Sequence, residues 1–219
     1  MASAVPAPHR RTRLLQTLRR WFDTTADAPA GGPGADRIDW LRAIPFALLH
    51  VACLGVIWVG VSWTAVAVAA ALYAVRMFAI TAFYHRYFSH RTFRASRPVQ
   101  FIFAVIGASS VQRGPLWWAA HHRHHHRHAD GPEDPHSPRE RGFWRSHMGW
   151  FLTRDAFATD LTRIPDLARF PELRWLDRFD TLVPVLLAAT LFGVGALLER
   201  FAPGLGTSGP QLLVWGFFI

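Results

Sequence analysis

Two long apolar segments dominate the first half of the chain. Residues 43–75 contain no Asp, Glu, Lys or Arg, and the apolar pattern continues with one interruption to Tyr84. A single helix of that length would extend roughly 63 Å, about twice the ~30 Å hydrocarbon thickness of a bilayer. The pattern therefore predicts a transmembrane hairpin with spans of about 43–61 and 64–84, in preference to a buried hairpin of a soluble protein.

The second half carries a third apolar run, residues 181–199, which is again long enough to span. A Pro/Gly-rich turn follows, and the run QLLVWGFFI begins a partial span at residue 211. Nine residues cannot cross a bilayer, so we expect a C-terminally truncated chain, cut within a fourth span. A shorter apolar run at 99–111 predicts a buried or membrane-surface helix. The expected fold is all-α and polytopic, with an incomplete membrane domain over 41–219 after a tail over 1–40.

Positive charge is concentrated in two parts of the chain. The net charge is +9, the pI is near 11.3, and all 24 basic residues are Arg. They lie mainly in the tail, which we expect to be flexible or to rest on anionic lipid, and in the polar region 85–180. Because cytoplasmic loops carry the positive excess, both parts should face the cytoplasm. No nucleic-acid motif accompanies these Arg residues, so we expect membrane lipid and no nucleic acid as a partner.

A first pair of histidines, His85 and His90, follows the second predicted span in the sequence HRYFSH. Five residues advance an ideal α-helix by about 500°, so the two rings should not share a helical face. They could still serve one site at a helix end or two adjacent metals. Alone, this spacing is a weak signal.

A second histidine group lies in WWAAHHRHHHRHAD, residues 117–130. His122, His125 and His126 have the spacing i, i+3, i+4, which places three imidazoles on one helical face. His121, His124 and His125 fit the same pattern in another register, and periodicity cannot decide between the two. Both histidine groups lie at the edge of apolar segments, which favours a metal site over an adventitious surface run.

The donor set narrows the choice of metal. Imidazoles suit Zn, Cu, Fe or Ni, and a structural zinc site often uses thiolates. The one cysteine, Cys53, lies within an apolar run and is expected to be a buried hydrophobe. Five or more histidines without a thiolate indicate more than one metal ion, and on a membrane scaffold they point to non-haem iron and O₂ chemistry.

Three stretches resemble the integral-membrane fatty-acyl desaturases, in particular bacterial acyl-CoA Δ9 desaturases related to stearoyl-CoA desaturase. They are RMFAITAFYHRYFSHR, QRGPLWWAAHHRHHHRHADGPEDPHSP and RGFWRSHMGWFLTR. The resemblance implies four transmembrane helices under a cytoplasmic cap in a bacterial inner membrane. It also implies two non-haem irons held in histidine boxes, which use O₂ to introduce a cis double bond, by expectation Δ9. The implied partners are a fatty acyl-CoA and an electron donor such as ferredoxin, rubredoxin or cytochrome b5 with its reductase.

The resemblance also assigns roles to individual residues. The implied iron ligands are His85, His90, His122, His125 and His126, which selects one register of the second group. The implied substrate contacts are Gln112, Trp117 and Trp118 along the acyl path and Arg154 at the CoA phosphates. Supporting hydrogen-bonding positions around the metals are expected at His121, His124, Asp134, His136 and His147, with His128 as a further bystander or supporting group.

Two departures from the family pattern change what we expect. Ala120 and His121 replace an Arg and an Asp that similar animal enzymes carry, which leaves acyl carrier protein or a phospholipid open as the carrier. The family's third box, H-x-x-H-H, and a lone upstream His lie beyond the fourth span. The chain thus holds five of nine expected ligands, and we expect it to be inactive unless the rest is supplied.

Two other functions fit parts of the pattern. A membrane di-iron hydroxylase of alkanes or lipids would use similar boxes and release an alcohol. A non-catalytic metal-binding or transport protein would need ionisable ligands at mid-membrane. The predicted spans offer only His50 and Arg76 for that purpose, so this function is less favoured.

Overall fold

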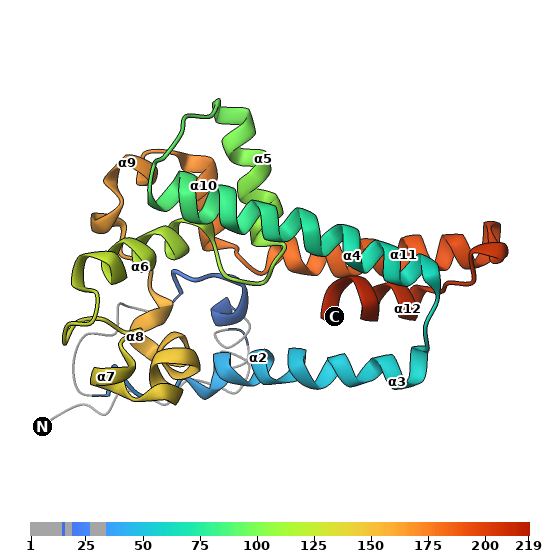
Figure 1. The fold of residues 1–219 in the computed structure, drawn as a ribbon, viewed down its shortest axis with the longest axis horizontal. Coiled ribbons are helices and arrows are strands. Elements are labelled where there is room, and N and C mark those ends of the chain that lie inside the picture. Colours follow the sequence, from blue (N-terminus) through green and yellow to red (C-terminus); the bar gives the residue numbers. More distant parts are fainter. Residues whose placement is uncertain (1–14, 16–18, 27–33) are drawn as a thin grey trace, which may run out of the picture.

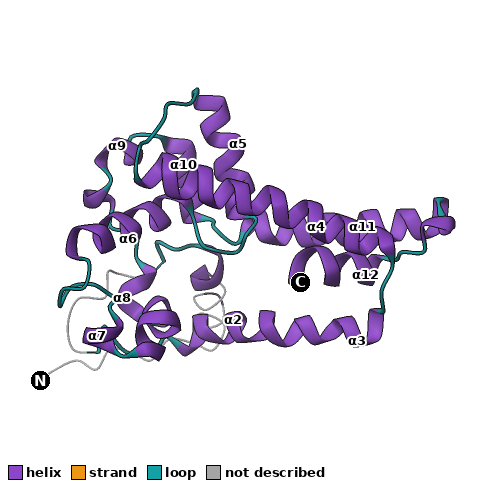
Figure 2. Cartoon of the chain, viewed as in Figure 1, coloured by secondary structure: helices purple, strands orange, loops and turns teal. Residues whose placement is uncertain are grey.

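The computed structural model describes residues 15, 19–26 and 34–219, and within these ranges every regular element is a helix (Figures 1 and 2). The all-α expectation is confirmed. Most of the predicted flexible tail lies outside the described residues. Within the described part of that tail, Asp23 is buried and pairs with Arg178 at 2.8 Å.

Among the described residues, three helices are long and apolar enough to cross a membrane: Trp40–Val59, Trp63–Ser89 and Leu182–Phe201. They agree with the three complete spans predicted from the sequence. Large apolar side chains on them are exposed, for example Trp58 at 79% and Trp63 at 88%. A surface of this kind is costly in water and is the expected surface of a helix that faces lipid.

The first two spans form a hairpin, as the sequence predicts. Helix α2 (Trp40–Ala52) continues through a 3-10 turn into α3 (Val56–Val59), which ends at Gly60 with a φ of +67°. Glycine adopts this left-handed conformation without a side-chain clash. Ser62 then caps helix α4 (Trp63–Phe78) by accepting a hydrogen bond from the backbone N–H three residues later. The chain therefore reverses within a few residues.

The last part of the chain folds back on the third long helix. Helix α11 (Leu182–Phe201) is followed by α12 (Gly209–Leu213), which continues as the π-helix η7 (Val214–Phe218). Figure 1 shows α12 lying against α11 and beneath α4. Gly195 permits this approach, because a Cβ there would lie 2.4 Å from the carbonyl oxygen of Ser208. The run predicted to start a fourth span is thus helical.

Three polar side chains in this apolar part form hydrogen bonds. The Ser62 hydroxyl donates to Gln211 Oε1 at 2.6 Å, and the Gln211 amide donates to the Val59 carbonyl at 3.0 Å. The Arg76 guanidinium donates to the Gly216 carbonyl. Each of these bonds satisfies a group that lipid could not.

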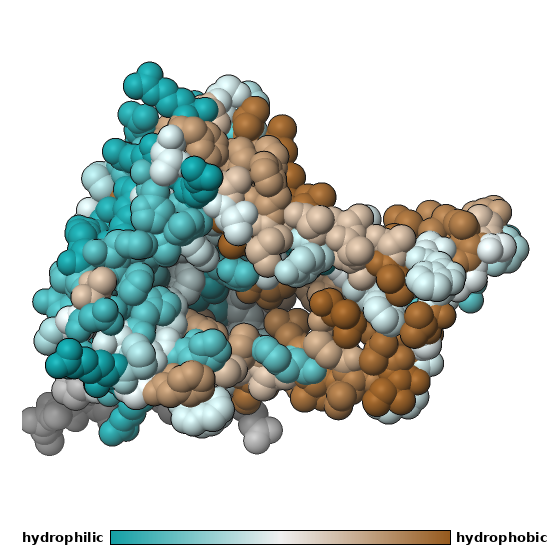
Figure 3. All heavy atoms as spheres, in the orientation of Figure 1, coloured by the Kyte–Doolittle hydropathy of each residue, from teal (hydrophilic) through white to brown (hydrophobic). Residues whose placement is uncertain are grey.

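Short helices form a cap at one end of the long ones. Figure 3 shows hydrophilic residues gathered over this cap and hydrophobic residues over the opposite end. The cap helices are α5 (Arg97–Ala108), α6 (Pro115–His128), α7 (Pro138–Arg141), α8 (Arg154–Phe157), α9 (Pro165–Ala168) and α10 (Pro171–Arg178). Helix α5 is the short apolar helix predicted near 99–111.

The core of the cap packs against the end of the second span. Tyr84, Phe88, Leu116 and Leu176 are at most 1% exposed, and they join that span to α6 and α10. Gly107 of α5 makes room for the Tyr84 ring, because a Cβ there would lie 2.2 Å from a ring carbon. The end of the second span is therefore held against three cap helices.

Candidate metal centre

The helix that carries His85 begins as an α-helix and has become a π-helix where it reaches His85. Ala79–Ser89 form the π-helix η2, and the His90 N–H bonds to the His85 carbonyl at 3.1 Å. A bond between residues five apart closes a wider turn than the α-helical one, so the two side chains come together. Their Nε2 atoms lie 3.2 Å apart. The prediction that the two rings do not share a face is therefore wrong, because it assumed α-helical geometry.

Helix α6 places two more histidines against this pair. His122 and His126 are four residues apart and share one face of α6, with their Nε2 atoms 3.1 Å apart. The Nε2 atom of His122 also lies 3.1 Å from that of His90. One ligand atom from each of His85, His90, His122 and His126 lies within 4.8 Å of the others. We call these residues the four-histidine cluster.

His125, the fifth predicted ligand, makes a different contact. Its Nδ1 lies 2.8 Å from Oδ1 of Asp134, which is 1% exposed, and its ring lies 4.8 Å from the His136 ring. A carboxylate accepts, so Nδ1 donates, and in the neutral form of the ring the lone pair is then on Nε2. This is how proteins orient histidines that bind metals. Asp134 in turn accepts from the backbone N–H groups of Asp130 and His136.

The electrostatics of the cluster favour a cation. Burial and then the neighbouring histidines lower the pKa of His122 to about 3, and the same causes lower the pKa of His90. Both rings are therefore neutral at pH 7. A neutral imidazole has one nitrogen with a free lone pair, which is available to a bound cation.

Arg123 connects the two histidine groups. Its guanidinium donates to the carbonyls of Phe88 and Ser89, which end the helix carrying the first pair. It also pairs with Asp166 at 2.7 Å, and Arg91 binds the same carboxylate. Carbonyls at a helix end have no partner within the helix and attract cations. Arg123 thus fixes the first pair relative to α6. No pattern in the sequence indicated this role for Arg123.

The start of α6 is capped by a residue from another helix. Gly114, at the N-cap position, has no side chain, and Asp177 of α10 occupies that space. The Asp177 carboxylate accepts from the Trp117 N–H at 2.7 Å and from the Thr159 hydroxyl at 2.6 Å. A carboxylate is stabilising at a helix N-terminus. Asp177 was absent from the sequence prediction because sixty positions separate it from Trp117.

Replacing Asp177 with alanine should destabilise the fold by roughly 2–3 kcal/mol, because it leaves two buried donors without an acceptor. Burial raises the pKa of Asp177 to about 6, although the bonds from Thr159 and Trp117 oppose this shift. The unfolded carboxyl ionises near pH 3.8, so the folded state binds more protons between about pH 4 and pH 6, and stability should fall as pH rises through that window.

Thermal unfolding in detergent, measured from pH 4 to pH 7, tests both statements. The Asp177→Asn variant keeps an acceptor but does not titrate, so it should lose less stability than Asp177→Ala and show a flatter dependence on pH. Equal losses in the two variants would contradict the capping role.

The two predicted tryptophans lie on either side of α6. Trp118 stacks on the His122 ring with centroids 4.6 Å apart, and it also lies 6.2 Å from the His85 ring. Trp117 is buried, donates from its indole to the Ala156 carbonyl and stacks on Trp150 at 5.7 Å. The structure therefore brings Trp118, and not Trp117, into contact with the four-histidine cluster.

Three other predicted residues have no contact with the cluster among the described residues. Gln112 is exposed in the loop before α6. Arg154 is exposed at the start of α8, and its backbone N–H bonds to the Arg37 carbonyl. His147 is exposed, and its ring stacks on Phe143 with centroids 5.5 Å apart. Their expected roles stay predictions.

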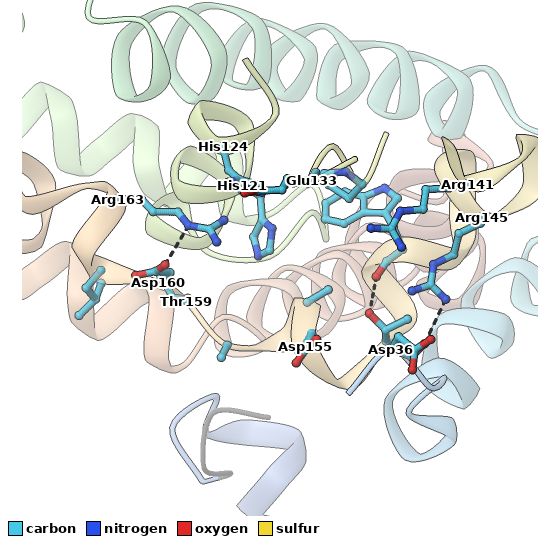
Figure 4. A pocket seen from close by; sticks show the side chains of 16 residues that line it. Asp36, His121, His124, Glu133, Arg141, Arg145, Asp155, Thr159, Asp160 and Arg163 are labelled. Atoms are coloured by element: carbon cyan, nitrogen blue, oxygen red, sulfur yellow. Dashed lines mark hydrogen bonds and ion pairs between the residues drawn. The ribbon is translucent and has the colours of Figure 1, made fainter. Parts of the chain in front are cut away.

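A pocket of roughly 550 Å³ opens on the cap beside α6, and Figure 4 shows its lining. His121 and His124 point toward it from α6. Burial and then nearby arginines lower the pKa of His121 to about 3, so its ring is neutral. The lining mixes charges, with Arg163 paired to Asp160 at 2.8 Å. The pocket can therefore hold a positively or a negatively charged group.

The donor set fits iron. Four imidazoles converge, and a fifth, on His125, has one nitrogen fixed by a carboxylate. Imidazole suits iron as well as zinc and copper. Which of the five predicted residues bind a metal, and how many ions they bind, stays a prediction.

Known proteins are similar to this chain in sequence. The family model for fatty acid desaturase matches residues 61–219. The chain is 36% identical over 127 residues to a palmitoyl-monogalactosyldiacylglycerol delta-7 desaturase of Arabidopsis thaliana, covering 57% of this chain and 30% of that protein. It is 36% identical over 109 residues to an sn-2 palmitoyl-lipid 9-desaturase of Nostoc sp., covering 48% and 38%.

A third relative, acyl-CoA 5-desaturase AL21 of Anemone leveillei, is 35% identical over 129 residues, covering 58% of this chain and 38% of that protein. The chain thus spans less than half the length of these relatives. The relatives differ in the carrier and in the position that their names state. The family match covers most of the chain, and three of the described helices are long and apolar enough to cross a membrane. The chain therefore belongs to the fatty acid desaturase family, and it is a membrane protein.

Proposed function

We propose that the protein is an O₂-dependent oxidoreductase that introduces a cis double bond into a fatty acyl chain. The observation that carries this proposal is the four-histidine cluster, assembled where the second apolar helix meets the cap. The family match and the desaturase names of the relatives support the same reaction class.

The cluster residues and His125 would hold two non-haem irons, together with further ligands that the family pattern places elsewhere. When bound, these irons and O₂ supply an oxidant strong enough to remove hydrogen from adjacent methylenes, which no side chain can do. Asp134 keeps His125 oriented, and Arg123 keeps η2 aligned with α6. Trp118 covers one side of His122 and would exclude water from the reacting methylenes.

For the substrate we propose a fatty acyl-CoA desaturated at Δ9. Arg154 is exposed and could meet the carrier's phosphates. Gln112, Trp117 and Trp118 would border the acyl path. His121 differs from the family's usual residue, so an acyl-lipid or acyl carrier protein substrate is the alternative. A separate donor such as ferredoxin, rubredoxin or cytochrome b5 would supply electrons.

The distribution of Arg residues supports an orientation with the cap and the N-terminus in the cytoplasm of a bacterial inner membrane. The cap region carries many Arg residues, while the turn near residue 62 carries none. Labelling of single cysteines in the cap from either side of the membrane would test the proposed orientation. We also propose that residues 41–219 act as one membrane domain.

Product analysis tests the proposed reaction. The protein is expressed from its complete reading frame in a bacterial host that lacks Δ9 desaturation, and the fatty acids are identified by mass spectrometry. We expect a new monounsaturated fatty acid that depends on O₂ and disappears in the His90→Ala variant. A hydroxylated product would identify a hydroxylase instead. No oxidised product, together with zinc flux into vesicles, would favour a transport protein.

A further inference from the structure

Helix α6 carries four histidines outside the four-histidine cluster, and two of these form a second pair. His124 and His128 are four residues apart, so they share one face of the helix. Each lies two positions from a cluster residue, His122 or His126, which corresponds to about 200° around the helix. One helix therefore presents two histidine pairs on opposite faces.

The second pair is joined by an acidic side chain from the loop that follows α6. The Nδ1 atoms of His124 and His128 lie 3.1 Å apart. Glu133 Oε2 lies 3.5 Å from His128 Nε2, and one ligand atom from each of the three residues lies within 4.8 Å of the others. The His128 Nδ1 atom also lies 3.2 Å from the His124 backbone carbonyl, which can only accept, so in the neutral ring the lone pair is on Nε2, the atom 3.5 Å from Glu133 Oε2. One nitrogen from each ring and one carboxylate oxygen can therefore serve a single ion.

A further hydrogen bond determines which ring nitrogen of His124 carries the proton. Its Nε2 lies 3.1 Å from the backbone carbonyl of Glu133, which can only accept. The ring therefore donates from Nε2 and leaves a lone pair on Nδ1, the atom that faces His128. Backbone carbonyls often fix metal-binding histidines in this way. Figure 4 shows His124 and Glu133 next to each other at the pocket.

We propose that His124, His128 and Glu133 form a second metal site, which binds a divalent cation of the zinc type. Two imidazoles and a carboxylate are a known zinc donor set, and three protein ligands leave a fourth position for water or a ligand from the adjacent pocket. The site shares no residue with the four-histidine cluster, so it does not depend on the proposed reaction.

Such an ion would fix the loop that follows α6. Glu133 is followed directly by Asp134, the residue that orients His125. An ion bound by Glu133 and the two histidines would therefore hold this loop against α6. Amide hydrogen exchange of residues 129–137 should slow when zinc is added.

The test is a titration of the full-length protein with zinc in detergent, in which calorimetry measures the heat of binding. The absorption spectrum of bound Co²⁺ is a second measurement, which reports tetrahedral geometry. His128→Ala and Glu133→Gln are each expected to remove one bound zinc per chain, or to weaken its binding at least tenfold, without changing the iron content. The matched controls are His50→Ala, on the first span, and Glu140→Gln, on α7. Glu133→Gln keeps the shape of an exposed side chain, so it separates loss of a ligand from loss of folding.

The inference is overturned if Glu133→Gln and His128→Ala retain wild-type zinc binding and exchange. It is also overturned if His122→Ala weakens the same class of zinc binding as much as His128→Ala, since that result indicates binding along the whole histidine run. A protein that keeps this zinc site but forms no desaturated product would refute the proposed function alone.

Discussion

The variant His122→Ala should lose at least half of the iron bound by the wild-type protein, and its yield of unsaturated product should fall roughly 100-fold or more. The Nε2 atom of His122 lies 3.1 Å from those of both His90 and His126, so it joins the two histidine groups. Loss of a residue that merely supports a metal ligand costs 10–100-fold in affinity or activity, and loss of a central donor should cost more. Iron analysis of the purified protein and fatty acid analysis of expressing cells measure the two effects.

The matched control for this variant is His50→Ala. His50 is exposed on the first span, and its ring bonds to the Phe46 carbonyl of its own helix. We expect this control to keep its iron content and its product within about twofold of the wild type. If both variants, His122→Ala and His50→Ala, retained full iron content, the four-histidine cluster would not be the iron site.

Replacing Arg123 with alanine should destabilise the protein by about 3 kcal/mol, because it leaves Asp166 and two helix-end carbonyls without their main donor. The Arg123 side chain is 16% exposed and that of Asp166 is 20% exposed, so water replaces the lost bonds only in part. For a protein of this size, the apparent Tm should fall by roughly 6–12 °C. Iron binding should weaken as well, since Arg123 holds η2 against α6.

Arg91→Ala is the control, because it removes the exposed ion pair with Asp166 and leaves the more buried pair between Arg123 and Asp166. Arg91 binds the same carboxylate, but its side chain is 56% exposed, and exposed pairs contribute about 1 kcal/mol or less. We expect a small change in Tm and normal iron binding. Equal effects of the two variants would show that only the charge around Asp166 matters, and that the bonds from Arg123 to Phe88 and Ser89 do not.

Acid should weaken the ion pairs of Asp166 with Arg123 and Arg91. Burial opposes ionisation of Asp166, but the Arg123 and Arg91 guanidinium groups lower its pKa to about 2. A carboxyl with a lowered pKa stabilises the fold above its unfolded value near 3.8. That contribution is lost as the pH falls toward 2, so the link between α6 and η2 persists at neutral pH.

The membrane spans could be read from the sequence because the signal is local. An apolar run of about 20 residues must be helical in lipid, since no other structure of a single segment satisfies its backbone there. Gly60 and Ser62 mark the turn between the first two spans by residue type alone. The pairing of His122 with His126 is equally local, because four positions on an α-helix always face the same way.

The first histidine pair shows where this reasoning failed. His85 and His90 come together because η2 is a π-helix, and no residue type in that stretch marks a π-helix. Within this π-helix, Tyr84 packs against Gly107 of α5, a contact between residues of different helices. A hydrogen-bonding role for Asp134 was expected only from the resemblance, and its contact with His125 was not predicted, since nine positions and a loop separate the two.

The sequence by itself determined the fold class, the long apolar helices and the residue types available for metal binding, because each depends on composition or short-range periodicity. Only the tertiary structure decided which histidines converge, how Arg123 and Asp177 fix α6, and that His124 and His128 meet Glu133 on the opposite face. Those contacts join residues from different helices and loops. Their geometry follows from the packing of the whole cap, which no pattern along one helix contains.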